Sequence, residues 1–553
     1  MNFELIPFPS FVFSFAAICG LFDFRFSQRN SSHPWDLCIS LFPIRVFRFC
    51  MQLCLFLFQV SSFLNSGTAG FRYSADLLPF VVFRMGYLAG LRARELNQTI
   101  GVMITASHNP AKDNGVKIVD PMGEMLAAEW EKYASELVNA SDEQLPTAVR
   151  ALEVQVGIYQ VWSGGVEFSV MEQCPITLGL LTTPQLHYIV RCKNDPSFGE
   201  AREIGYYARL TDAFKALLKV GSNYSPNLVL DCANGVGGEK MRMLCRFVPE
   251  GSLRIQFRNE DGVLNHECGA DYIKIGQVLP TGFDDVDVKA KCASFDGDAD
   301  RLIYFSALIV LLDGDIIAVL LAKYIKETLE EAGIDDLSIG VVQTAYANGN
   351  STRYLKDGIT PVFVPTGVKH LHHAAMKFDI GIYFEANGHG TVVFSDKFDK
   401  LIRRCAFQFS LRNLFSEKKS TLIKYFSRVV GDAIADLLAV ESLLRWYGLS
   451  VEDWERSLYT NAPSVQLKVP VTDRSIYKTT YEETTLLEPA GVQEKIDALV
   501  EKHHEARAFV RSSGTENIVR VYAEAQTPDE GRGQWFGSFR CNSVLHAHYN
   551  WIC

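Results

Sequence analysis

The sequence predicts an α/β protein built from several domains. Short apolar runs alternate along the chain with stretches in which apolar residues recur every three or four positions, the pattern of strands alternating with helices. Polar loops rich in small residues follow several strands, as after Asp231, Phe295 and Phe384. A chain of 553 residues also exceeds a single hydrophobic core and is long enough for three or four domains.

The first half of the chain becomes regular at the glycine turn Gly67 to Arg72. Each later helix has the helical apolar period, and each strand is a continuous apolar run. A strand leads into Asn234-Gly-Val-Gly-Gly238 and a helix, but the G-x-G-x-x-G spacing of a dinucleotide site is absent. The elements expected here are helices over 77–97, 125–138 and 206–219 and strands over 100–104 and 227–231.

The second half repeats this plan. A long amphipathic helix is followed by apolar strands, and a second long helix precedes a last unit that mixes one helix with strands. The elements expected here are helices over 315–331, 431–446 and 492–503 and strands over 339–344, 380–384 and 519–524.

Four stretches have neither a helical nor a strand period: residues 1–60, 153–178, 398–428 and 528–553. We predict that residues 1–60 and 528–553 lie outside the fold. We also predict that 153–178 fails to supply a buried strand to the first domain, which exposes the edges of neighbouring strands. The chain as written is therefore expected to be poorly soluble or weakly active.

Composition excludes several classes of protein. A net charge of −10 disfavours a nucleic-acid binder. Thirteen cysteines without a C-x-x-C pair disfavour a zinc ribbon or a disulfide framework and favour a reducing compartment, here the cytoplasm. No Lys or Arg precedes the apolar run Phe8 to Phe22, and Arg48 interrupts the run Phe47 to Leu64, so we expect no membrane association.

A serine lies on a tight loop at the end of a short buried strand. The apolar run Ile100 to Ile104 breaks into Thr105-Ala-Ser-His-Asn-Pro110, and a proline cannot continue a strand ladder. Ser107 therefore occupies a position where functional side chains often collect. These six residues alone also fit an ordinary turn, and it is the three loops that follow that favour a functional interpretation.

Three carboxylates alternate with small residues in Asp296-Gly-Asp-Ala-Asp-Arg301. Asp296, Asp298 and Asp300 are too close together to be ionised at once without a cation. Carboxylate oxygens are hard ligands, so the loop predicts a site for Mg²⁺ or a similar ion. An EF-hand is excluded because its sixth and twelfth positions, normally Gly and Glu, are here Arg and Ala.

Two further loops have the chemistry to bind a phosphorylated sugar. Glu385-Ala-Asn-Gly-His-Gly390 offers a carboxylate and an amide to sugar hydroxyls. Arg511-Ser-Ser-Gly-Thr515, with Arg520 beyond it, offers backbone N–H groups, hydroxyls and two guanidiniums to a phosphate. Each loop alone also fits a surface turn, but the four loops together suit the movement of a phosphoryl group on a sugar.

In this order the four loops resemble the α-D-phosphohexomutase superfamily, and the sequence Glu-Ala-Asn-Gly-His-Gly resembles its acetylglucosamine branch. The resemblance runs from about Gly67 to Gln526, with gaps. It implies an α/β fold of four domains around a central active-site cleft. It also implies reversible conversion of N-acetylglucosamine 6-phosphate to the 1-phosphate, for UDP-N-acetylglucosamine synthesis. The implied domains are 61–185 with the serine loop, 186–307 with the metal loop, 308–450 with the sugar loop and 451–527 with the phosphate loop.

The resemblance implies roles for individual residues. Ser107 would carry the phosphoryl group, and Mg²⁺ would bind Ser107 and the three aspartates. Lys117 would be the acid or base, with His108 as the second candidate. The substrate would be held by Glu385, Ala386 and Asn387 at the sugar and by Arg511, Ser512, Ser513, Gly514, Thr515 and Arg520 at the phosphate that is not transferred. No protein partner is inferred.

Departures from the family leave alternatives open. Gly157-Ile-Tyr-Gln-Val stands where the family shows Gly-Arg-Asp-Thr-Arg, which favours a product that binds sugar phosphate without turnover. Ser512 replaces the usual proline, which is a milder change. A glucose or mannose phosphomutase is the alternative within the enzyme class. A serine hydrolase is disfavoured because no G-x-S-x-G elbow surrounds Ser107.

Overall fold

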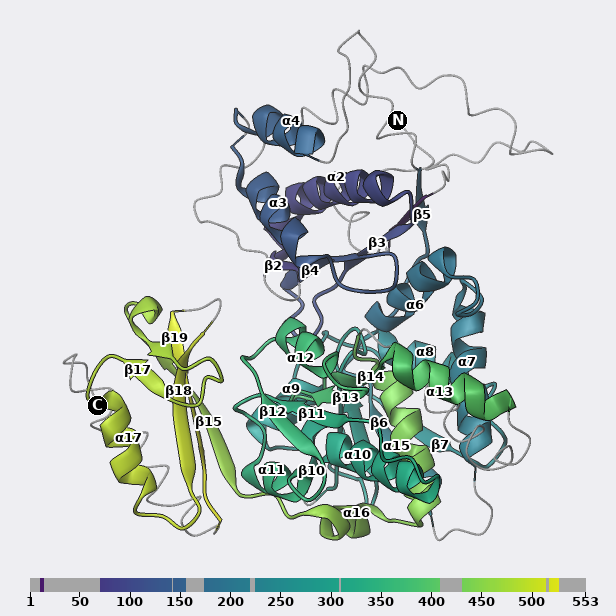
Figure 1. The fold of residues 1–553 in the computed structure, drawn as a ribbon, viewed down its shortest axis with the longest axis vertical. Coiled ribbons are helices and arrows are strands. Elements are labelled where there is room, and N and C mark those ends of the chain that lie inside the picture. The colour runs from purple at the N-terminus through teal and green to yellow at the C-terminus, as the bar shows by residue number, and fades with distance from the viewer. Residues whose placement is uncertain are drawn as a thin grey trace.

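The computed structural model describes residues 10–13, 70–141, 143–155, 174–218, 224–307, 310–407, 430–513 and 517–526. Their strands form four sheets of three to five strands and one two-stranded ribbon, with helices packed against the sheets (Figure 1). The predicted α/β class is confirmed. No helix in the described part of the chain has the length and apolarity needed to cross a bilayer.

The first sheet, in the order β2-β4-β3-β1-β5, carries the serine loop between β3 and β4. β3 is a continuous apolar run with its first four residues buried, and α2 packs against both β3 and β4. The elements of this part are β2 Phe71–Ser74, η1 Ala75–Leu77, α2 Leu78–Leu96, β3 Ile100–Ile104, β4 Asp113–Val119, α3 Ala128–Asn139, α4 Leu145–Gln155, β5 Cys174–Thr177 and α6 Thr183–Asn194.

One strand of the first sheet comes from a stretch that we predicted to lie outside the fold. β1, Ser10–Phe13, pairs in parallel with β3 on one side and with β5 on the other. The prediction for residues 1–60 is therefore wrong for these four residues, and the end of 153–178 supplies the edge strand β5. Four residues are too few for a period to be recognised, although Phe-Val-Phe suits a buried strand.

Apart from these four residues, the stretch 1–60 lies outside the described part of the chain, which resumes at residue 70. Residues 156–173, which include Gly157, also lie outside the described residues. So do 408–429 and the predicted tail 528–553, whereas the start of the unpatterned stretch at 398 belongs to α13. The predictions for these stretches are otherwise not tested by the structure.

The second sheet, in the order β10-β9-β8-β6-β7, carries the aspartate loop between the antiparallel strands β8 and β9. β10 extends this sheet beyond the predicted boundary at residue 307, because it pairs with β9. The elements are α7 Glu203–Leu217, β6 Asn227–Asp231, α8 Val236–Cys245, β7 Arg254–Arg258, α9 Ala270–Gly276, β8 Cys292–Phe295, β9 Leu302–Phe305 and β10 Leu311–Leu312.

The third sheet, in the order β12-β11-β13-β14, carries the sugar loop between the antiparallel strands β13 and β14. Its helices share one apolar core with the second sheet. The elements are α10 Gly314–Glu331, β11 Ile339–Gln343, α11 Gly349–Leu355, β12 Thr360–Phe363, α12 Val368–Ala375, β13 Ile380–Phe384, β14 Gly390–Phe394, α13 Asp396–Phe407, α15 Ala433–Tyr447 and α16 Val451–Leu458.

The fourth sheet, in the order β15-β19-β18, lies to one side of the second and third sheets (Figure 1). Its phosphate loop again joins two antiparallel strands, β18 and β19. The elements are β15 Ser464–Pro470, η2 Arg474–Ile476, β16 Lys478–Thr479, β17 Leu486–Glu488, α17 Val492–Val500, β18 Arg507–Ser512 and β19 Ile518–Glu524.

A buried carboxylate joins α15 to the second sheet. Glu441 is fully buried and accepts hydrogen bonds from the Tyr304 hydroxyl at 2.9 Å, from the Tyr224 hydroxyl and from the Lys291 ammonium. Because the ammonium is itself buried, each of the two charges depends on the other for its solvation.

We expect Glu441→Ala to lower the free energy of unfolding by about 3–5 kcal/mol, because it leaves the Lys291 ammonium buried without a carboxylate. Thermal unfolding of the full chain should show a midpoint several degrees lower than that of the wild type. Glu494→Ala on α17, where the side chain is exposed, is the control and should leave the midpoint unchanged. Equal midpoints for the two variants would mean that the buried pair adds nothing to stability.

Candidate active site

The serine loop holds Ser107 in an uncommon backbone conformation. Ser107 has φ of 53°, in the left-handed region that residues other than glycine seldom occupy. Its N–H donates to Oγ1 of Thr105 at 2.9 Å, and its side chain is buried. Strained residues of this kind cluster at functional sites, because the surrounding structure must hold them in place.

Residues of the second domain also hold the serine loop in place. Nδ2 of Asn265 donates to the carbonyl oxygens of Ser107 at 2.7 Å and of Asn109 at 2.9 Å. The aspartate loop approaches so closely that a Cβ on Gly297 would lie 2.5 Å from the Ser107 carbonyl oxygen. Only glycine fits at this position, so the serine and aspartate loops form one unit.

The aspartate loop places its three carboxylates beside Ser107. Oγ of Ser107 donates to Oδ2 of Asp296 at 3.1 Å. The other oxygen of Asp296 accepts the backbone N–H groups of Asp300 and Arg301 at 3.0 and 3.2 Å, which fixes the turn. One oxygen from each of Asp296, Asp298 and Asp300 lies within 4.8 Å of the others, and all three residues are buried.

The aspartates differ in their charge states. Burial, with repulsion from the other two, raises the pKa of Asp296 well above its usual value. Burial also opposes ionisation of Asp300, but Lys117 and His389 hold its pKa well below the usual value. For Asp298, burial and Asp300 are outweighed by Lys117 and by the Thr183 hydroxyl, which donates at 2.6 Å, and its pKa is lowered. These opposite directions agree with the expectation that three carboxylates this close resist joint ionisation without a cation.

The carboxylate cluster fits a divalent metal ion. Oδ1 of Asp298 is buried and accepts no hydrogen bond from the described residues. The buried Oδ1 of Asp300 has only Nδ1 of His389 near it among the described residues, at 3.4 Å, apart from the more distant Nε of Arg301. Buried carboxylate oxygens without donors are costly unless a cation binds them. The Nζ of Lys117 lies 3.3 Å from Asp298 and 3.2 Å from Asp300, on their other oxygens, and supplies the positive charge there.

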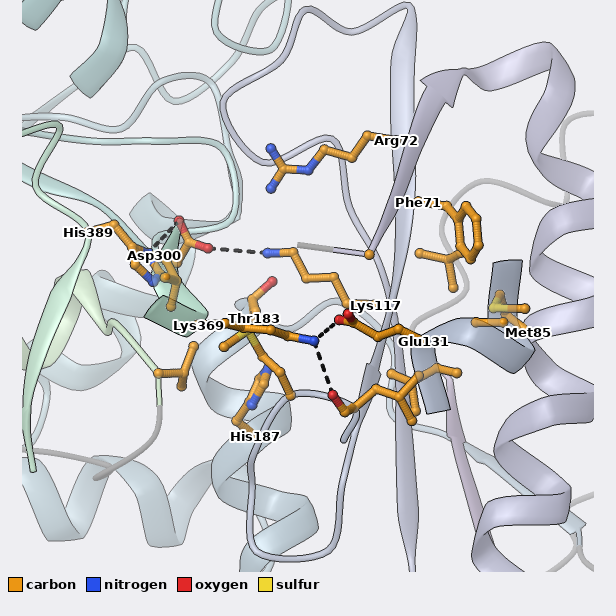
Figure 2. Close-up of a pocket in the computed structure, with 18 of the residues that line it drawn as sticks. Phe71, Arg72, Met85, Lys117, Glu131, Thr183, His187, Asp300, Lys369 and His389 are labelled. Carbon is orange, nitrogen blue, oxygen red and sulfur yellow. Dashed lines mark hydrogen bonds and ion pairs between the residues drawn. The ribbon is translucent and has the colours of Figure 1, made fainter. Parts of the chain in front are cut away.

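Both predicted acid or base candidates lie at this cluster. Lys117, on β4, points across the cleft to Asp300 (Figure 2). His108 lies between Ser107, with Nδ1 3.4 Å from Oγ, and Arg72, whose Nη1 is 3.2 Å from the same nitrogen. Burial and the Arg301 guanidinium lower the pKa of His108 to about 3, so its imidazole is neutral near pH 7.

The sugar loop lines the same cleft as Lys117 and Asp300. Glu385 lines this cavity. His389 lines it too, together with Arg72 and Thr183 (Figure 2). Nδ1 of His389 lies 3.4 Å from Oδ1 of Asp300, which links the third sheet to the aspartate loop.

The other two predicted sugar-loop residues shape this turn. Asn387 contacts Glu385 through Nδ2 at 3.4 Å and accepts the His389 N–H at 3.1 Å. Ala386 is buried. Of the three sugar-loop residues predicted to bind substrate, Glu385 is the one that lines the cleft, together with Lys117 and Asp300.

A lysine of the third domain crosses the cleft to the first domain. Lys369, at the start of α12, pairs with Glu131 of α3 and donates to the Leu126 carbonyl at 3.1 Å (Figure 2). Burial lowers the pKa of Lys369 to about 8, although Asp120 and Glu129 oppose this.

The phosphate loop forms part of a row of cations in the fourth sheet. Arg511 lies directly opposite Arg520, and Arg520 lies opposite Lys468, so the three side chains share one face. Like charges in such positions repel unless an anion binds between them. Ser512 ends β18, and the Ser513 carbonyl accepts from Arg474 at 3.0 Å. Gly514 and Thr515 lie outside the described residues.

Sequence reasoning missed several residues of the site. Arg72 ends a glycine turn and Thr183 lies in no recognisable motif, so neither residue is indicated by the sequence. Asn265 has no motif, and the position of Lys468 depends on strand register, which the sequence does not give. Only His389 could have been found, because it stands inside the predicted sugar loop.

Family models match the chain in four successive parts. Residues 88–145 match the phosphoglucomutase/phosphomannomutase alpha/beta/alpha domain I, and residues 467–534 match the C-terminal domain of the same family. Residues 198–303 and 313–449 match domains II and III of phosphoacetylglucosamine mutase AMG1. The fold and the site therefore define a phosphohexomutase of four domains.

Similar proteins narrow the assignment. Phosphoacetylglucosamine mutase from Sus scrofa is 46% identical over 500 residues, which cover 84% of this chain and 91% of that protein. The Candida albicans enzyme is 43% identical over 512 residues, covering 83% and 93%. The chain belongs to the phosphoacetylglucosamine mutase family.

Solved structures of similar proteins support the same family assignment. N-acetylphosphoglucosamine mutase from Aspergillus fumigatus, in complex with GlcNAc-6P and magnesium, is 43% identical with a TM-score of 0.78, covering 88% of this chain and 96% of that one. An N-acetylglucosamine-phosphate mutase in its product complex is 40% identical with a TM-score of 0.81, covering 90% and 100%.

Proposed function

We propose that this chain interconverts N-acetylglucosamine 6-phosphate and N-acetylglucosamine 1-phosphate through a phosphoserine at Ser107, for UDP-N-acetylglucosamine synthesis. The observation that carries the proposal is the 3.1 Å contact between the Ser107 hydroxyl and Asp296, inside a buried cluster of three carboxylates. Mg²⁺ held by Asp296, Asp298 and Asp300 would neutralise the charge of the transferring phosphoryl group.

The proposed reaction has two transfers. The phosphoryl group leaves the Ser107 oxygen, which takes up a proton, and bonds to the free sugar hydroxyl, whose proton passes to a base, so that a sugar bisphosphate forms. After the bisphosphate turns over, its other phosphoryl group bonds to the Ser107 oxygen, and the released sugar oxygen regains a proton. Lys117 is the proposed acid and base because it lies on the cleft and contacts the carboxylates, whereas His108 orients Ser107 and Arg72.

Substrate binding is assigned to the two remaining loops. Glu385 and Asn387 would bind the sugar hydroxyls, and Ala386 gives the turn its shape. The phosphate that is not transferred would be bound by Arg511, Ser512, Ser513, Gly514, Thr515 and Arg520, with Lys468 completing the row of cations.

We place the reaction in the cytoplasm, which the unpaired cysteines of the described part support. We propose no nucleic-acid or obligate protein partner.

The test compares turnover of the purified chain on the 6-phosphates of N-acetylglucosamine, glucose and mannose. We expect kcat/KM to be highest for N-acetylglucosamine 6-phosphate. A preference for glucose or mannose 6-phosphate would support the other mutase classes. Binding of all three without turnover would support the alternative that the chain is a catalytically impaired product.

A further inference from the structure

The fourth sheet packs against the third domain along one face. Several hydrogen bonds and an ion pair lie at one end of this face. Glu524 accepts the Gly349 N–H at 3.0 Å and pairs with Arg507 at 2.6 Å. Arg507 also donates to the Ala345 carbonyl at 3.1 Å. Further along this face, the ring of Tyr346 packs edge-on against the stacked rings of Phe509 and Tyr522, with centroid distances of 5.1 and 5.8 Å.

At the other end of this face, near the phosphate loop, a carboxylate of the fourth domain also contacts the third domain. Oε2 of Glu483 accepts the Thr366 N–H at 2.9 Å and the Thr366 hydroxyl at 2.7 Å. The same oxygen lies 3.3 Å from Nη1 of Arg511. One oxygen therefore takes donors from two domains, and one of these donors is the arginine proposed to bind the substrate phosphate.

Glu483 holds this position at a conformational cost. It lies in the turn between β16 and β17, where its N–H donates to the Thr480 carbonyl at 3.0 Å, and its φ is 59°. A glutamate in the left-handed region is unusual, and the glycine that would suit the turn has no side chain to reach Thr366.

We propose that Glu483 is a gating residue for the phosphate site: its carboxylate occupies the donors of Arg511 and Thr366 until the phosphate of the substrate displaces it. A phosphate oxygen accepts from the same guanidinium, amide and hydroxyl donors, and it carries the greater negative charge. This inference rests on the proposed function of Arg511. It predicts that Glu483 weakens phosphate binding, whereas a residue that only orients Arg511 would strengthen it.

The test measures binding of inorganic phosphate and of N-acetylglucosamine 6-phosphate to the full chain by calorimetry. Glu483→Gly suits the positive φ and removes the carboxylate, and Glu483→Gln keeps the length but removes the charge. Both variants should bind each ligand roughly five- to tenfold more tightly than the wild type. KM should fall by a similar factor, and kcat should not rise with it.

Two controls separate gating from general effects. Glu482→Gln changes the same charge one residue away and should leave both affinities unchanged. Adding Arg511→Ala to Glu483→Gly should abolish the gain. Unchanged or weaker phosphate binding in both Glu483 variants would overturn the proposal, because damage to the fold does not tighten binding. If the wild type has no mutase activity, the proposed function fails, but the phosphate titrations still decide the role of Glu483.

Discussion

Ser107→Ala is expected to lower kcat by roughly ten-thousandfold or more, because the proposed mechanism carries the phosphoryl group on the Ser107 oxygen between the two transfers. Alanine fills the same backbone position, and the carbonyl that accepts from Asn265 is retained. The fold and the affinity for sugar phosphate should therefore persist. A coupled assay for N-acetylglucosamine 1-phosphate gives the rate, and mass spectrometry of purified wild type should find a phosphate on Ser107.

The control for this variant is Ser457→Ala, an exposed serine of α16 whose hydroxyl donates to the Trp454 carbonyl at 3.1 Å. It should retain full activity. Turnover of Ser107→Ala near the wild-type rate would remove the phosphoserine mechanism altogether. Loss of activity together with loss of sugar-phosphate binding would instead point to a damaged fold.

Asp298→Asn is expected to lower kcat by about a hundredfold or more and to raise the Mg²⁺ concentration needed for half-maximal rate. The amide keeps the size of the side chain, but one ligand charge is lost, and the cation binds less tightly. Calorimetric titration of the full chain with Mg²⁺ tests the affinity independently of turnover.

Asp284→Asn is the matched control, because this side chain is exposed in the same domain. It removes the same charge from the chain and should change neither Mg²⁺ affinity nor rate. Equal Mg²⁺ affinity in Asp298→Asn and the wild type would show that the aspartate loop is structural and that the metal binds elsewhere.

Elements with a clear period were predictable from the sequence. The strands at 100–104, 227–231 and 380–384 have the predicted limits, because each is a continuous apolar run ended by polar residues. The helix predicted over 77–97 forms over Leu78–Leu96 and ends at Asn97, which has φ of 51°. The sequence also singled out Ser107 and the three aspartates, and the structure brings these four residues together, while their roles stay predictions.

Features that depend on pairing were not predictable. The row formed by Arg511, Arg520 and Lys468 exists only through the register of three strands. The strand β1 was missed because its four residues show no period and because its partners come from distant parts of the chain. The contact of Glu483 with Thr366 joins two domains through a turn with no motif, so its chemistry appears only when the domains are assembled.

Asn265 donates to the Ser107 carbonyl, and the backbone of Gly297 packs against the same carbonyl. These contacts distinguish the part of the site that holds the serine and the aspartates from the part that holds the phosphate loop. The serine and the carboxylates form a single block, since they cannot move apart without breaking that packing. The proposed phosphate loop belongs to the fourth sheet, which lies to one side of the second and third sheets. A ligand that must present first one end and then the other could therefore be regripped while the reaction centre stays assembled.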